Sequence, residues 1–223
     1  MATVAAVRKE IYDLTGAMVE VGLSIDQNYP TEKVVPGKAG GVTEITVPGS
    51  DEISAALKNR PYAETYDALK DKRAYNIRMV DGALIQMRYR FENNQLTKHV
   101  LAFYPSPDLI EYQNDPELYE DEILYADVIR KDVVTTPIRF DFDDVSFKEF
   151  VHPKSHFTIG QYKNCRITVL TAMTPFRFIN FILRAFYNSP FLEYCSEWKG
   201  TAPDFPHSAT PLERSHLHLA FQE

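Results

Sequence analysis

The stretch that decides the fold runs from His152 to Asn188 and reads HPKSHFTIGQYKNCRITVLTAMTPFRFINFILRAFYN. Its first half contains two short runs with β-branched residues, 156–159 and 165–170, separated by the turn-forming segment 160–164. Runs of this kind on either side of a turn are typical of paired strands. We therefore expect a β-hairpin with a longer loop in this half.

The second half predicts a buried helix over about residues 174–187. Thr174 can cap the free amide hydrogens, and Pro175 suits the first helical position because its missing N–H would be unpaired there. Apolar residues then cover most of the helical circumference, as in a helix buried on most sides. Arg177 and Arg184 lie seven positions apart and share one face. They either solvate the outer stripe of this helix or form a basic stripe that faces an anion.

Composition limits the class of protein. The chain has 223 residues and a formal net charge of −7, which argues against broad non-specific nucleic-acid binding but not against a local basic patch. Its two cysteines, Cys165 and Cys195, lie in separate segments and suit a reducing cytosol. No signal peptide or membrane span is predicted. We expect a cytoplasmic protein that makes no membrane contact.

The N-terminal part predicts a helix and then a region rich in loops. Apolar residues recur at three- and four-residue steps within 3–24, which indicates an amphipathic helix that packs on the sheet. Region 25–50 is rich in Pro and Gly and is expected to be mainly loop, with one short strand at 41–47. A short helix that ends near Leu57 and another at 62–70 complete this part.

The middle of the chain predicts an antiparallel meander with one strongly apolar face. The expected strands are 75–80, 83–91, 96–104 and 138–142, with a hairpin turn at Asp81–Gly82. Alternation places Arg78, Arg88 and Arg90 together on the polar face. These three arginines are candidate binding residues, either simply solvated or forming a local basic patch for nucleic acid.

An acidic segment follows at 108–132. It interleaves carboxylates with tyrosines, among them Tyr112, Tyr119 and Tyr125. This composition suits a protein-binding surface, and a solvated helical excursion is the alternative.

Four of the six histidines lie in two segments that we expect to be strand-like. One pair flanks Pro153, and the other lies two residues apart in a predicted closing strand, 213–221. Two histidines and a carboxylate can hold a divalent metal with open positions. The first pair would share a metal only if the chain bends at Pro153, because an extended segment would separate them by about 13 Å. The candidate ligands are His152, His156, His216, His218 and Asp141.

A metal-free alternative uses the same histidines for phosphodiester cleavage. His156 and His218 would act as base and acid, and Arg166 or Arg139 would stabilise the developing charge. A third interpretation is a polar network that only holds loops in place.

Several segments resemble one bacterial family. HPKSHFTIGQYKNCRI at 152–167 and TPFRFINFILRAFY at 174–187 resemble the domain of unknown function DUF2290, and the similarity covers roughly residues 75–220. RMVDGALIQMRYRF and HVLAFYPSP are also similar to that family. The resemblance carries over no catalytic residue. Families of this kind often lie in defence or mobile-element neighbourhoods, which implies an accessory component of an antiphage defence system.

We expect a single α+β domain over 1–223, with an N-terminal helix and loop region at 1–72 and a sheet core at 73–223. The sheet is mostly antiparallel, and the 174–187 helix packs on its apolar face beside the N-terminal helix. Because no established catalytic motif is present, a non-enzymatic protein-binding component is favoured. The alternative is a histidine- or metal-dependent nuclease.

Overall fold

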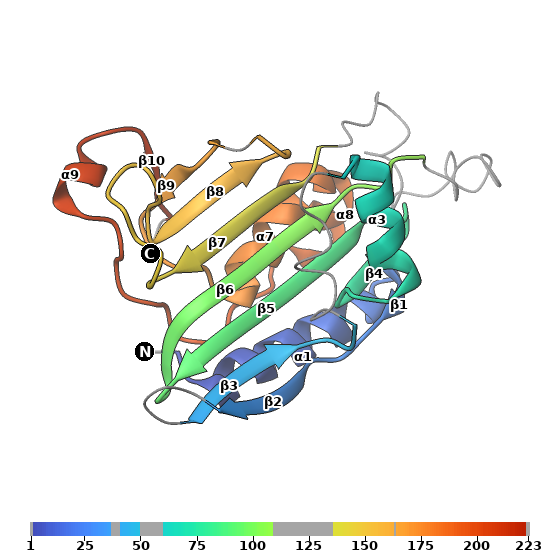
Figure 1. Cartoon of the computed structure of the whole chain (residues 1–223). Helices are drawn as coiled ribbons and strands as arrows, with labels where there is room; N and C mark the ends of the chain where they lie inside the picture. Colours follow the sequence, from blue (N-terminus) through green and yellow to red (C-terminus); the bar gives the residue numbers. More distant parts are fainter. Residues whose placement is uncertain (1, 37–40, 50–59, 109–135, 163, 222–223) are drawn as a thin grey trace.

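The computed structural model describes residues 2–36, 41–49, 60–108, 136–162 and 164–221. Within these ranges the fold is α+β, with ten strands in one mostly antiparallel sheet (Figure 1). The strands are β1 (Ser24–Gln27), β2 (Thr31–Pro36), β3 (Gly41–Thr46), β4 (Ile77–Met79), β5 (Leu84–Glu92), β6 (Gln95–Tyr104), β7 (Ile138–Asp143), β8 (Ser155–Ile159), β9 (Ile167–Val169) and β10 (His218–Leu219). The helices are α1 (Val4–Glu20), α3 (Tyr62–Asp71), α7 (Pro175–Phe186), α8 (Asn188–Pro190), the π-helical η2 (Phe191–Cys195) and α9 (Pro211–Arg214).

Strand β5 joins the two parts of the sheet. The main strand order is β1-β4-β5-β6-β7-β8-β9-β10, and β3 pairs with both β2 and β5. Strand β4 pairs with the start of β5 at Leu84 and Ile85, whereas β3 pairs with its second half from Tyr89 to Glu92. The short β9–β10 pair is parallel. The predicted meander is confirmed as β4 to β7, and the separately predicted hairpin is confirmed as β8 and β9.

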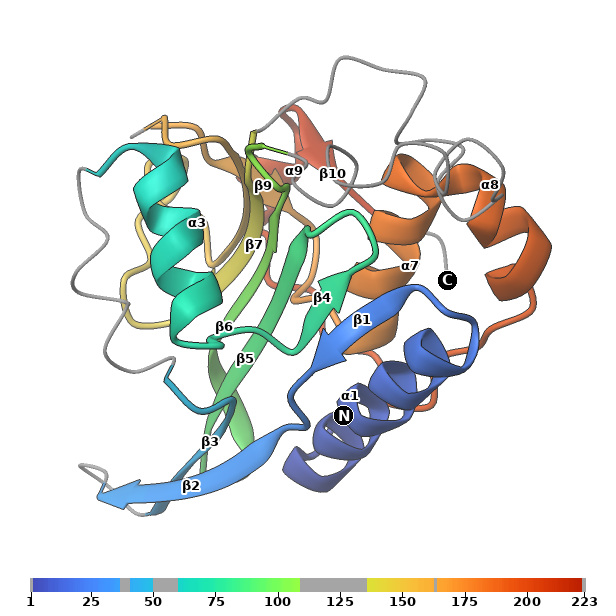
Figure 2. The same cartoon turned by 90° about the vertical axis from the view of Figure 1, so that its right-hand side faces the viewer.

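The helices cover the two faces unequally. Helices α1 and α7 lie on one face of the sheet, whereas α3 lies on the other face at one end (Figure 2). Alternation in β5 directs Ile85, Met87, Tyr89 and Phe91 into the main core, which α1 and α7 close. Leu84 points the other way and packs in a smaller apolar cluster under α3. The expected packing of both long helices on the apolar face is confirmed.

The ends of the helices follow from local sequence. The Thr174 side chain accepts a hydrogen bond from the Arg177 amide at 3.3 Å, and Pro175 occupies the first helical position as expected. Gly22, with φ at 74°, follows the end of α1, because glycine adopts this left-handed conformation without steric cost. Among the described residues, no helix is long and apolar enough to cross a membrane.

The expectation of a loop-rich region at 25–50 was wrong in part. Strands β1 and β2 also form there, and β2 pairs with β3 from Thr31–Thr46 to Pro36–Gly41. Strand β2 lies at an edge of the sheet and Pro36 is its last residue. A proline in this position is compatible with a strand, because its missing N–H interrupts no hydrogen bond within the sheet. The predicted helix ending near Leu57 lies outside the described residues, as does nearly all of the acidic segment.

Candidate functional site

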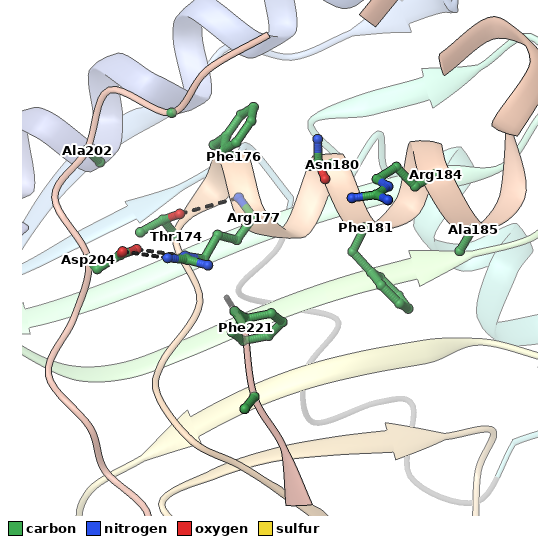
Figure 3. A pocket seen from close by; sticks show the side chains of 12 residues that line it. Thr174, Phe176, Arg177, Asn180, Phe181, Arg184, Ala185, Ala202, Asp204 and Phe221 are labelled. Atoms are coloured by element: carbon green, nitrogen blue, oxygen red, sulfur yellow. Dashed lines mark hydrogen bonds and ion pairs between the residues drawn. The ribbon is translucent and has the colours of Figure 1, made fainter. Parts of the chain in front are cut away.

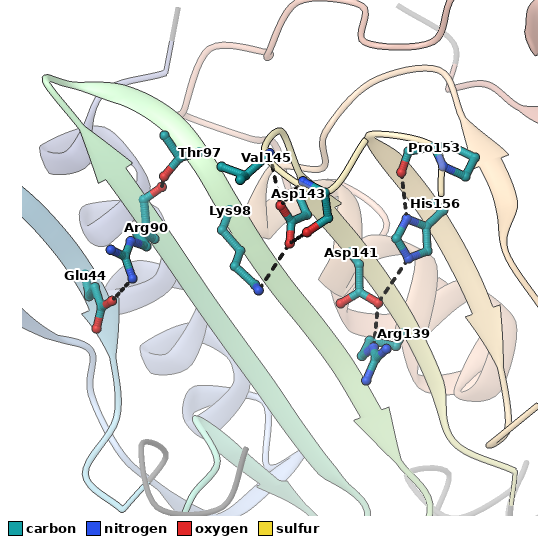
Figure 4. A network of polar contacts seen from close by, with 11 residues as sticks. Glu44, Arg90, Thr97, Lys98, Arg139, Asp141, Asp143, Val145, Pro153 and His156 are labelled. Carbon is teal, nitrogen blue, oxygen red and sulfur yellow. Dashed lines mark hydrogen bonds and ion pairs between the residues drawn. The ribbon is translucent and has the colours of Figure 1, made fainter. Parts of the chain in front are cut away.

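Pairing across the sheet gathers several predicted site residues on the face opposite α1 and α7. Asp141 on β7 pairs with His156 on β8, His156 pairs with Thr168 on β9, and Thr168 pairs with His218 on β10. Directly paired residues point to the same face, so these four form one row. Glu44, Arg90, Lys98 and Asp143 form a neighbouring row. Within it Arg90 pairs with Glu44 at 3.1 Å and Lys98 with Asp143 at 3.3 Å (Figure 4).

Asp141 and His156 form the centre of the first row. Arg139 Nε donates to Asp141 Oδ2 at 2.6 Å, and His156 Nε2 lies 3.5 Å from the same oxygen (Figure 4). His156 Nδ1 lies 2.9 Å from the carbonyl oxygen of Pro153. A hydrogen bond to that carbonyl requires the proton on Nδ1, so in the neutral ring Nε2 has no proton to donate to Asp141.

Burial keeps His156 uncharged. The residue is 3% exposed, and this desolvation lowers the pKa of His156, although the charge of Asp141 opposes the shift. Arg166, just before β9, lies near enough for its charge to lower this pKa further. The ring therefore connects β7, β8 and the Pro153 turn rather than facing solvent, where a substrate would have to reach it.

The chain bends after Pro153. This bend is the condition under which His152 and His156 could share a metal. The rings of His152 and His156 are in edge contact, with centroids 4.8 Å apart. Among the described residues, however, no group of three His, Cys, Asp or Glu side chains could hold a metal ion. The proposed metal site therefore receives no support from this part of the chain.

The predicted closing strand 213–221 was wrong over most of its length. Thr210 and Glu213 form a reciprocal capping box around Pro211, so the chain makes the helical turn α9 instead. Strand β10 is limited to two residues, and His216 precedes it. His216 and His218 therefore do not lie on one face of one strand. His218 lies two strands from His156, about 10 Å at the usual strand spacing.

The other candidate residues fall into two groups. Arg78 pairs with Leu84, and alternation along β5 places Arg88 and Arg90 on the same face as Leu84, as predicted. Their binding role stays a prediction. Tyr112, Tyr119 and Tyr125 lie outside the described residues.

Sequence reasoning missed a cluster of exposed apolar residues where two loops meet. The β7–β8 loop and the 210–217 segment are joined by a hydrogen bond from Thr210 Oγ1 to Glu149 Oε1 and by one from the Phe150 amide to Glu213 Oε1, at 2.5 and 3.3 Å. We call the exposed apolar residues that lie near these two hydrogen bonds in the sequence the loop surface. It consists of Phe150, Val151, Leu212 and Leu217, which are 43, 66, 51 and 83% exposed.

Phe150 is held in a conformation that bulky residues rarely adopt. Its φ is 62°, in the left-handed region. Such a residue is strained by about 1–3 kcal/mol and persists only where its surroundings fix it. Here the turn itself fixes Phe150, because the Val151 amide donates to the Lys148 and Glu149 carbonyls at 3.0 and 2.8 Å. Two contacts from the other segment add to it: the buried Glu213 carboxylate accepts from the Phe150 amide, and the His216 ring centroid lies 4.8 Å from that of Phe150.

Comparison with known proteins identifies the family. The family described as uncharacterized conserved protein (DUF2290) matches residues 23–221. The chain therefore belongs to this family, as the resemblance of its central segments implied. No curated protein and no solved structure matches the chain significantly.

Proposed function

We propose that this chain is a non-enzymatic protein-binding component and that the loop surface is its contact with a partner. The observation that carries the proposal is Phe150, a strained and exposed aromatic residue that a buried carboxylate fixes beside further exposed apolar side chains. Strain in a loop that serves no core packing is typical of functional positions. Clustered apolar side chains on a surface mark sites of protein contact.

The chemistry of the loop surface defines the partner. Burying each of its large apolar side chains would contribute about 1.5–3 kcal/mol, so a few of them can dominate an interface. Exposed charges of both signs lie on the same two segments, with Lys148 and Arg214 on one side of the balance and Asp144 and Glu149 on the other. We infer a protein partner that presents apolar side chains surrounded by polar groups of both signs.

The histidines favour binding over catalysis. A general acid or base must reach the proton that it transfers, whereas His156 is buried and its Nδ1 binds a backbone carbonyl. Its intended catalytic partner, His218, lies two strands away. Among the residues that the structure describes, no specific contact supports the nuclease alternative. A place in antiphage defence stays a prediction.

The test compares purified full-length variants that differ only on the surface. Leu217→Asp and Val151→Asp place a negative charge on the loop surface. Val34→Asp is the matched control, because Val34 is 73% exposed on β2, near the opposite edge of the sheet. Each tagged chain is expressed in the native host at normal level, and co-purified proteins and nucleic acids are quantified.

The proposal predicts one stoichiometric protein that the wild type and Val34→Asp retain equally. Its recovery should fall at least tenfold with Leu217→Asp and with Val151→Asp. Equal recovery with all four chains would contradict the assigned surface. Recovery of nucleic acid alone, or of only a second copy of this chain, would contradict the proposed partner.

A further inference from the structure

A pocket of about 680 Å³ lies along α7, between the segment 200–204 and the C-terminal residues Ala220 and Phe221 (Figure 3). Its size is in the range of about 300–1,000 Å³ that holds small ligands. It shares no residue with the loop surface, so its function is a separate question.

The pocket contains both arginines of the α7 outer stripe. Arg177 and Arg184 are separated by seven residues, or about 10.5 Å along the helix axis, and both line the cavity. Arg177 forms a two-point ion pair with Asp204, at 2.7 Å to Oδ1 and 2.5 Å to Oδ2. Arg184 lies over the Phe191 ring at 5.7 Å and is directed back along α7 toward Asn180 (Figure 3). The lining carries two positive charges and one negative charge.

Three types of lining group lie one after another along this cavity. At one end Arg184 and Asn180, four residues apart on one helical face, can donate to an anion. At the other end the exposed Asp204 carboxylate can accept from hydroxyl or N–H groups, and its ion pair with Arg177 lowers the pKa of Asp204, so it stays charged. Between them, the rings of Phe181 and Phe221 line the wall, and Phe221, with the Arg177 guanidinium 5.6 Å from its centroid on one side, can pack against a flat ring on the other.

Hydrogen bonds to a buried carboxylate hold two of the pocket's walls in place. Glu10 on α1 is 2% exposed and accepts from the amides of Phe176, Thr201 and Ala202 at 3.1, 2.6 and 2.8 Å. These hydrogen bonds hold the start of α7 against the 200–202 segment. A cavity built on such fixed backbone is suited to a defined small ligand.

We propose that this pocket binds a nucleoside monophosphate. Its phosphate would bind Arg184 and Asn180, its ribose would lie along Phe181, and its base would pack against Phe221 and donate an N–H group to Asp204. An acidic chain with a local basic pocket suits a free nucleotide better than a polyanion.

The test is isothermal titration of the wild-type chain with AMP, GMP, CMP and UMP. Adenosine, inorganic phosphate and a 5′-phosphorylated decathymidylate complete the set. The same titrations with Arg184→Gln measure the contribution of the pocket. Arg60→Gln, at an exposed arginine outside the pocket lining, is the matched control.

Saturable binding of at least one nucleotide below 1 mM is expected. It should weaken at least tenfold with Arg184→Gln, remain unchanged with Arg60→Gln, and exceed the binding of adenosine and of phosphate at least tenfold. Absence of binding by all four nucleotides would overturn the proposal, as would equal affinity of wild type and Arg184→Gln or of nucleotide and adenosine. Tighter binding of the decathymidylate than of any mononucleotide would overturn the ligand class.

Discussion

The carboxylate of Glu10 on α1 accepts a hydrogen bond from the amide of Phe176 at the start of α7, 166 residues away in the chain. Its other oxygen accepts from the amides of Thr201 and Ala202. One buried side chain thus connects the first helix, the main core helix and the C-terminal segment. Loss of this carboxylate should therefore affect the whole fold and not only α1.

Glu10→Ala should lower the free energy of unfolding by about 2–4 kcal/mol, because three backbone donors lose their acceptor and each buried unpaired group costs about 1–3 kcal/mol before relaxation. Chemical denaturation measures this change. Glu20→Ala, at the exposed end of α1, is the control and should stay within about 0.5 kcal/mol of the wild type. Equal stability of the two variants would show that the Glu10 contacts contribute nothing.

A second prediction concerns pH and the buried His99 on β6. Burial lowers the pKa of His99 to about 3, and its Nε2 accepts from the Met173 amide at 3.1 Å, so the folded state keeps this ring neutral. The unfolded chain takes up a proton below about pH 6.5. The contribution of His99 is thus complete above pH 6.5 and is lost as the pH falls toward 3.

As the pH falls from 6.5 to 5, the free energy of unfolding should therefore decrease because of His99, by up to about 1.4 kcal/mol per pH unit. His156, whose pKa burial also lowers, adds a decrease in the same direction. Denaturation at half-unit pH steps measures the slope. His99→Gln removes this titrating ring and should make the slope shallower. A flat profile from pH 6.5 to 5 would exclude a buried neutral His99.

A third prediction separates strain from stability at Phe150. Phe150→Gly should leave the free energy of unfolding unchanged or raise it by up to about 1 kcal/mol, because glycine adopts a positive φ without strain. The same change should weaken partner capture at least tenfold, because it removes an anchoring ring of the loop surface. Denaturation and quantitative co-purification measure the two effects. A stability loss of several kcal/mol with unchanged capture would assign Phe150 a structural role instead.

Local patterns were sufficient for the parts of the fold that a single segment determines. The alternation of β5 and the Thr174–Pro175 start of α7 each have one physical solution, so sequence predicted them correctly. Strands β1 and β2 were missed because prolines and glycines around them concealed the pairing with β4 and β3. Helix α9 was missed although Thr210 and Glu213 carry the capping-box spacing.

The candidate site was less predictable because it depends on contacts between distant segments. Sequence suggested that His156 and Asp141 could meet, and β7–β8 register brings them together. It could not reveal that burial and the Pro153 carbonyl would occupy the ring. Phe150 adopts its positive φ at the centre of a tight turn, in which the Val151 amide donates to the Glu149 carbonyl at 2.8 Å, and its own amide binds Glu213, 63 positions away. No Gly or Asn stands at position 150 to indicate such a turn.

Hydrogen–deuterium exchange on the purified complex tests the protein-binding function most directly. The chain is labelled alone and with the partner that the wild type and Val34→Asp both retain. The proposed function predicts slower exchange at 144–151 and 210–217 in the complex, with β2 unchanged. Unchanged exchange in both loop segments, with protection elsewhere, would contradict the assignment of the loop surface as the binding site.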